Sequence, residues 1–133
     1  MQPVLWEIDV YNYDENLDLL IQCKDNITNA LKKENALISV SDTLVSKIML
    51  GVFANVPAFD TFFKKSNIGV KKFDANSLLI IKDYYNSHKS DFDSFHIPTI
   101  NFSGQNTDNE YTIAKLVDMY GFIDGKMEHN RIL

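Results

Sequence analysis

Apolar residues recur at three- and four-residue steps along much of this 133-residue chain, and this period limits its possible folds more than any other feature. Such spacing places apolar side chains on one face of an α-helix. The clearest stripe follows Asp14, a residue type that favours the helix N-cap. It predicts a first helix over residues 15–33. The apolar face of this helix comprises Leu17, Leu20, Cys23, Ile27, Ala30 and Leu31.

Two further helices are predicted to begin at residues that favour the N-cap position. Ser41 precedes a helix over residues 42–54, which is apolar on nearly all sides and is therefore expected at the centre of the fold. Asp74 precedes a helix over residues 75–89. Residues 90–94 are expected to add one more turn.

Another helix is predicted in the last third of the chain. Thr107 and Glu110 have the spacing of a capping box, and an apolar stripe with helical period follows them. Gly121 suits the position just beyond a helix C-terminus. We therefore expect the helix to end there and the polar tail 126–133 to be frayed. The stripe comprises Ile113, Leu116, Val117 and Tyr120.

The remaining segments are predicted to be loops or extended. Residues 3–11 mix β-branched and aromatic residues, which favours either a short strand or an extended arm over residues 1–13. Residues 96–102 are expected to be extended around Pro98. With five Gly and three Pro, the chain has few of the turn formers that an all-β domain uses. We therefore predict a mainly α fold, in which residues 1–133 form one domain: a compact bundle of about five helices with an N-terminal arm.

Composition narrows the setting of the protein. No apolar run reaches the ~20 residues that span a bilayer, the N-terminus lacks the features of a signal peptide, and the single Cys23 cannot form a disulfide within the chain. These features predict a cytoplasmic protein with no membrane contact and a buried thiol. The histidines are far apart and match no zinc pattern, so neither a metal nor a cofactor is expected. They are His88, His96 and His129.

The segment Val52–Ser66 places Asp60 among four phenylalanines. Pro57 suits the first turn of a short helix over residues 58–65, where the Asp60 carboxylate would meet unpaired N–H groups. Alternatively, apolar surroundings would raise the pKa of Asp60, as acid–base catalysis requires. Both roles stay open, and with them the question of whether the protein is an enzyme.

A lysine cluster follows within a thirteen-residue segment, 61–73, that contains no acid. Such a cluster is either an ordinary solvated loop or a patch in which lysines and nearby backbone amides contact nucleic-acid phosphates. The sequence therefore makes nucleic acid a candidate partner. The cluster comprises Lys64, Lys65, Lys71 and Lys72.

The N-terminal region indicates a second kind of partner. Residues 1–30 carry six acids and one base, whereas the rest of the chain is balanced in charge. An acidic arm with exposed Trp6 and with Tyr11 or Tyr13 would contact a basic protein or a second copy of the chain.

The segment Thr43–Lys65 reads TLVSKIMLGVFANVPAFDTFFKK and resembles part of the helix-hairpin-helix DNA glycosylase superfamily. In that family an apolar helix leads to a V-D-T-H-like motif with the essential Asp, and here Ala58-Phe59-Asp60-Thr61 occupies its place. The resemblance implies a shared helical architecture and would make Asp60 the catalytic Asp. The glycine-rich hairpin of the family is replaced by Ile38-Ser39-Val40-Ser41, its lyase Lys by Asp42, and its iron–sulfur cysteines are absent.

Two blocks, KIMLGVFANVPAFDTFF and YTIAKLVDMYGFIDG, are similar to blocks in a group of uncharacterised bacterial and phage proteins that read G-x-[VI]-P-A-[FY]-D-x-[YF]-F and K-[LI]-[VI]-D-M-Y. This resemblance implies a phage or mobile-element context and no particular chemistry. The second block contains Asp118. This residue would form an acid–base site with Asp60 if their helices pack together, or would instead be solvated or paired with Lys115 or Asn109.

The sequence thus ranks three functions. The first is a small intracellular helical protein that binds nucleic acid through its lysine patch. The alternative is a protein–protein interaction module, a regulator or an inhibitor, whose acidic arm binds another protein or a second copy of the chain. The third is a small acid–base enzyme that uses Asp60.

Overall fold

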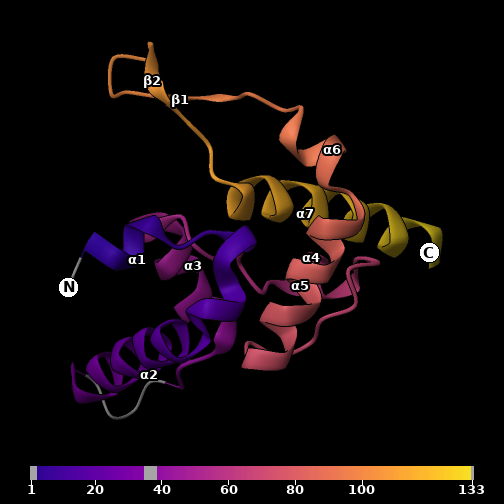
Figure 1. The fold of residues 1–133 in the computed structure, drawn as a ribbon. Helices are drawn as coiled ribbons and strands as arrows, with labels where there is room; N and C mark the ends of the chain where they lie inside the picture. The colour runs from indigo at the N-terminus through magenta and orange to yellow at the C-terminus, as the bar shows by residue number, and fades with distance from the viewer. Residues whose placement is uncertain (1–2, 35–38, 133) are drawn as a thin grey trace.

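Helices form most of the computed structural model, which describes residues 3–34 and 39–132 (Figure 1), so the predicted mainly α fold is confirmed. In chain order the elements are α1 Pro3–Glu7, the 3₁₀-helix η1 Val10–Glu15, α2 Leu17–Glu34, α3 Asp42–Phe53, α4 Thr61–Lys65, α5 Ala75–Ser87, α6 Lys89–Asp93, β1 Pro98–Ile100, β2 Asn106–Glu110 and α7 Ile113–Ile132.

Local capping explains where α3 and α5 begin, and both starts agree with the sequence prediction. Ser41 Oγ accepts a hydrogen bond from the N–H of Leu44 at 3.1 Å. Asp74 accepts one from the N–H of Ser77 at 2.8 Å. Each side chain satisfies one of the N–H groups that a helix leaves unpaired in its first turn.

The N-terminal segment is not an extended arm, so that prediction was wrong. Its described part forms α1 and η1, and Val10 and Tyr13 of η1 are fully buried. The Tyr13 hydroxyl donates to the carbonyl of Asn55 at 2.7 Å, and the side chain of Asn55 donates to the carbonyl of Leu5 at 3.1 Å. Ile8, Val10 and Tyr13 of this segment instead pack into the core of a helical fold.

The buried apolar side chains form one cluster to which η1 and all the helices from α2 to α7 contribute. At its centre, the ring of Phe59 stacks on that of Phe73 with centroids 5.0 Å apart, and Phe63 meets Phe59 edge-on at 5.5 Å. Cys23 is buried in the same cluster, as predicted. The aromatic segment before and within α4 therefore supplies core packing.

Helix α7 crosses α4 at very short range, because two glycines of α7 face α4. A Cβ atom at Gly125 would lie 1.6 Å from the carbonyl oxygen of Phe62, and one at Gly121 would lie 2.4 Å from the ring of Phe63. The predicted helix end at Gly121 and the predicted frayed tail 126–133 were wrong, because α7 continues to Ile132.

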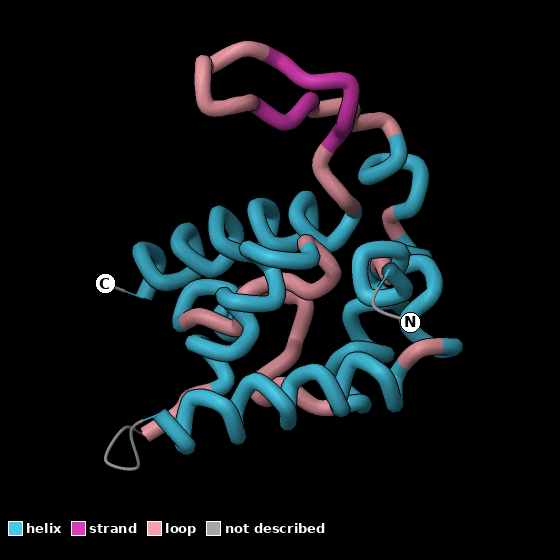
Figure 2. The backbone as a smooth tube through the Cα atoms, turned by 90° about the vertical axis from the view of Figure 1, so that its left-hand side faces the viewer, coloured by secondary structure: helices cyan, strands magenta, loops and turns pink. Residues whose placement is uncertain are grey.

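A two-stranded hairpin, β1–β2, occupies the region where the last helix was predicted to start. Thr107 and Glu110 lie in β2, so they do not form a capping box. The strands are antiparallel, with Pro98 opposite Glu110, and they stand away from the helices in both views (Figures 1 and 2). The extended segment predicted around Pro98 is present as β1.

The start of α7 is capped from a distant part of the chain. The carboxylate of Asp9 accepts hydrogen bonds from the N–H groups of Ile113 and Ala114 at 2.9 and 2.8 Å. Thr112 adds a local cap, since its hydroxyl accepts from the N–H of Lys115 at 3.2 Å. Asp9 is buried, so this bond fixes the N-terminal segment against the first turn of α7.

The α4–α7 crossing predicts a large contrast between two glycine substitutions. Gly125→Ala should lower the free energy of unfolding by about 1–3 kcal/mol or more, because the added methyl group collides with backbone. Gly51→Ala in α3 has no atom within 4 Å of the new Cβ and should raise it by about 0.5–1 kcal/mol through helix propensity. Urea unfolding of both variants measures the difference. Equal midpoints would show that α4 and α7 are not in this close contact.

Candidate functional site

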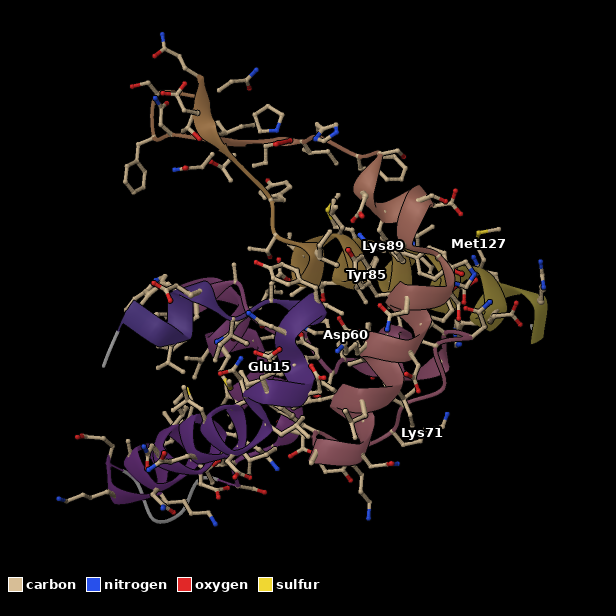
Figure 3. The ribbon with its side chains drawn as sticks, viewed as in Figure 1. Glu15, Asp60, Lys71, Tyr85, Lys89 and Met127 are labelled. Atoms are coloured by element: carbon tan, nitrogen blue, oxygen red, sulfur yellow. The ribbon has the colours of Figure 1, made fainter. Side chains whose placement is uncertain are left out.

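Asp60 caps α4. Its carboxylate accepts a hydrogen bond from the N–H of Phe63 at 2.8 Å, and the helix begins at Thr61 instead of the predicted residue 58. The structural role that the sequence offered for Asp60 is therefore confirmed, with the residue at the N-cap itself. Figure 3 shows Asp60 in the middle of the molecule, with helices around it.

Asp118 of α7 lies beside the same turn. Its Oδ1 accepts a hydrogen bond from the N–H of Ala58 at 2.9 Å, and its Oδ2 lies 3.6 Å from Lys115 Nζ, one of the two partners predicted for it. Burial raises the pKa of Asp118, and the charge of Asp60 raises it further, whereas the Ala58 N–H and Lys115 oppose the shift.

The structure thus brings Asp60 and Asp118 to one place, as the acid–base hypothesis requires. Each carboxylate, however, accepts a hydrogen bond from the backbone of residues 58–63. The hydroxyl of Tyr120, on the same helix as Asp118, donates to Asn67 Oδ1 at 3.0 Å. The pair therefore fixes the turn between α3 and α4, and catalysis by it stays a hypothesis.

Two of the four lysines of the predicted patch, Lys64 and Lys65, lie in the last turn of α4, and the side chain of Lys71 contacts the backbone of that turn. Lys71 Nζ donates to the carbonyl of Lys64 at 3.0 Å, and Lys65 Nζ lies 2.7 Å from His129 Nδ1 of α7. Lys71 projects from the edge of the molecule in Figure 3, and Lys72 beside it is also exposed. Within the described residues, none of the four lysines forms an ion pair with a carboxylate.

The aromatic residues proposed for partner binding have different environments. Trp6 and Tyr11 are each 55% exposed. Tyr13 is fully buried and hydrogen-bonded, so it cannot contact a partner, and the prediction for it was wrong. The ring of Trp6 already rests edge-on against Phe53 with centroids 4.6 Å apart.

An open apolar groove of about 310 Å³ runs between α6 and α7, and the sequence did not reveal it. One wall is α7, and the opposite wall comes from α6 and the chain that follows it. The α7 wall comprises Leu116, Met119, Tyr120 and Ile123. The opposite wall comprises His88, Asp91, Phe92, Phe95 and Ile97.

Tyrosine side chains close one end of the groove. Tyr84 of α5 stacks on Tyr120 with centroids 5.6 Å apart and on His88 at 4.3 Å. Both tyrosine hydroxyls donate to Asn67 Oδ1, at 3.4 Å from Tyr84 and 3.0 Å from Tyr120. Burial raises the pKa of Tyr84 well above its usual value, with smaller contributions from Tyr120 and from the charge of Asp124. This end therefore presents neutral, aromatic surface.

The apolar face of α7 continues past the groove. Ile123 is 57% exposed and Met127 is 54% exposed, and Figure 3 shows Met127 on the outer side of α7. From Leu116 to Met127 this stripe covers eleven residues, or roughly 16 Å of helix. The sequence contained the signal, since Ile123 and Met127 extend the stripe from Tyr120 at helical spacing. This extension of the stripe was missed because the helix was predicted to end at Gly121.

Neither a metal centre nor a membrane span is found in the described chain. Over residues 3–34 and 39–132, no three side chains of His, Cys, Asp or Glu are grouped so that they could hold a metal ion. In the same ranges, no helix combines the length and apolar character needed to cross a bilayer.

Comparison with protein-family models, with curated proteins and with solved structures found no match. The two resemblances stated above therefore stay expectations.

The raised pKa of Asp118 predicts a specific pH dependence of stability. Because its folded-state pKa lies above the ordinary value of 3.8, its contribution to the free energy of unfolding is fully present below that value and is lost as the pH rises through the folded-state pKa. Asp118→Asn keeps an oxygen for the Ala58 N–H and does not titrate. The wild type should therefore lose stability relative to Asp118→Asn as the pH rises from the ordinary value of 3.8 through the folded-state pKa.

Urea unfolding across this pH range measures the effect. Asp118→Ala serves as a control, because it leaves the Ala58 N–H without its acceptor and should lower the free energy of unfolding by about 1–3 kcal/mol at every pH. Parallel pH profiles for the wild type and Asp118→Asn would contradict the raised pKa.

Proposed function

We propose that the protein is a protein-binding module and that the groove between α6 and α7 is its binding site. One observation carries the proposal: an apolar groove open to solvent continues into the exposed side chains of Ile123 and Met127. Contiguous apolar surface of this kind marks interaction sites in soluble proteins. Aromatic and methionine side chains, which dominate the groove, are also enriched at the centres of interfaces.

The surroundings of the groove favour a macromolecular partner over a small ligand. Phe95 and Ile97 lead from the groove into the hairpin, where Ile100 is 61% exposed and Phe102 is fully exposed. An isolated two-stranded hairpin is marginally stable in water. Apolar residues on a projecting hairpin, next to an open groove, together offer a surface that a folded partner can cover.

A matched pair of variants tests this proposal. Ile123→Glu places a charge in the groove, and Val52→Glu places one on α3, where Val52 is 54% exposed and outside the groove. Immobilised wild type, Ile123→Glu and Val52→Glu would be exposed to extract of the source cells, and the bound proteins quantified by mass spectrometry. A genuine partner should bind Ile123→Glu at least about tenfold less than the other two, a loss of about 1.4 kcal/mol.

Circular dichroism and urea unfolding control for folding, since both substituted side chains are more than half exposed. Partners retained equally by Ile123→Glu and Val52→Glu would place the binding surface elsewhere on the protein. Failure of the wild type to retain any protein above background would remove the proposal.

A second candidate function, nucleic-acid binding, is supported by the lysines at the end of α4. The supporting observations are that Lys64 and Lys65 lie in the last turn of α4, that Lys71 contacts this turn, and that none of the three forms an ion pair within the described residues. Asp124 lies at the border of the patch, since its carboxylate accepts from the N–H of Asn67 at 2.8 Å. This nearby negative charge, with the net charge of −5, makes nucleic acid the weaker candidate.

Salt dependence tests the nucleic-acid proposal. If Lys71 and Lys72 each neutralise one phosphate, Lys71→Glu/Lys72→Glu should weaken binding and reduce the slope of log K against log salt by about 1.8, which is about 0.9 for each phosphate. The control Lys32→Glu/Lys33→Glu changes the net charge equally at the exposed end of α2. Fluorescence anisotropy with labelled duplex DNA and single-stranded RNA measures both. Equal slopes for the two variants, or no binding by the wild type, would reject this function.

A further inference from the structure

The shape of the groove indicates what kind of segment occupies it. The stripe Leu116, Tyr120, Ile123, Met127 repeats at intervals of four, three and four residues, so it is straight along α7. Another helix can lie along such a stripe, with apolar residues at i, i+3, i+4 and i+7 in contact with it. An extended peptide would need a row of free backbone N–H and C=O groups, and side chains of α6 and α7 form the groove walls.

The length of the apolar stripe from Leu116 to Met127 determines how long a helix the groove can bind. Helix α6 is five residues long, and its Phe92 packs edge-on against Tyr120 with centroids 6.1 Å apart. Beyond that contact, Ile123 and Met127 stay more than half exposed. A partner helix that reaches from the groove wall at Leu116, which is 6% exposed, to Met127 would span roughly 16 Å, or about three turns.

Charge distinguishes between possible partner helices. Asp91 lines the groove. Asp124 lies beside its closed end, since its carboxylate accepts from the N–H of Asn67, whose side-chain oxygen accepts from both tyrosine hydroxyls. Within the described residues, neither carboxylate forms an ion pair. The nearby Lys89 is already paired with Asp93. Asp91 and Asp124 therefore place negative charge at these two points beside the groove, where they complement a helix with Lys or Arg beside its apolar face.

The same charges disfavour a second copy of this chain as the occupant. A second copy that docked through its own α7 would bring another Asp124 to the groove. Like charges brought together in an interface oppose binding.

We infer, on the basis of the function proposed above, that the groove binds a basic amphipathic helix of another protein. The partner helix presents an apolar stripe of about three turns to Leu116, Tyr120, Ile123 and Met127. Its Lys or Arg side chains flank that stripe and face Asp91 and Asp124. This arrangement predicts affinity from the apolar stripe and selectivity from the carboxylates.

Three labelled synthetic peptides of eighteen residues test the inference by fluorescence anisotropy. The first carries Leu at i, i+3, i+4 and i+7 with flanking Lys, the second has Glu in place of each Lys, and the third scrambles the first. The wild type should bind the Lys peptide at least about tenfold more tightly than the Glu peptide, since two exposed ion pairs contribute about threefold each. The scrambled peptide, which lacks the stripe, should bind more weakly than the first.

Variants that remove carboxylate charges test whether Asp91 and Asp124 cause the preference for the Lys peptide. Asp91→Asn/Asp124→Asn should reduce the preference for the Lys peptide about tenfold. The control Asp18→Asn/Asp25→Asn removes two exposed charges of α2 and should leave the preference unchanged. Ile123→Glu should lower the affinity for the Lys peptide, because it removes apolar contact.

Equal binding of the Lys and Glu peptides, or equal binding of the scrambled peptide, would overturn the inference. So would an unchanged preference in Asp91→Asn/Asp124→Asn. If cellular partners still require Ile123 in that case, the proposed function stands and only the chemistry of the occupant is wrong. Sedimentation that shows self-association of the wild type, abolished in Ile123→Glu, would assign the groove to a second copy.

Discussion

The contact between α4 and α7 determines the arrangement on which the other features depend. The backbone of Phe62 occupies the space that a side chain at residue 125 would take, and the ring of Phe63 does the same at Gly121. One face of α7 is thereby held against the aromatic core, and the opposite face is directed away from it. Since α6 covers only part of that opposite face, the groove is a direct result of the crossing.

This geometry distinguishes two surfaces of the protein, of which the sequence indicated only the lysine cluster. The groove consists of apolar side chains that water solvates poorly, so a partner gains free energy by covering it. The lysines at the end of α4 are well solvated, and Lys71 also satisfies a backbone carbonyl at a helix C-terminus, where a positive charge is favourable without any partner. A structural role therefore accounts for part of the lysine cluster and for neither Ile123 nor Met127.

Helix boundaries that depend on residues close together in the sequence could be predicted, whereas those that depend on contacts between residues far apart in the sequence could not. The caps at Ser41, Asp60 and Asp74 depend on a side chain and an N–H three residues apart, so local patterns identified them. The start of α7 depends on Asp9, and the role of Gly121 depends on Phe63 across the interface. Local rules gave the wrong result at both ends of that helix. The groove was missed because its α7 wall was predicted to stop at Gly121.

The hydrogen bonds between Asp9 and the first turn of α7 also constrain the order of folding. Acceptor and donor are separated by 105 residues at Ala114, and contacts of such long sequence separation close late because they require a large loss of chain entropy. During synthesis, the N-terminal helices emerge from the ribosome well before the residues that Asp9 caps. Until those residues emerge, the Asp9 carboxylate stays hydrated, and the chain cannot complete its native topology.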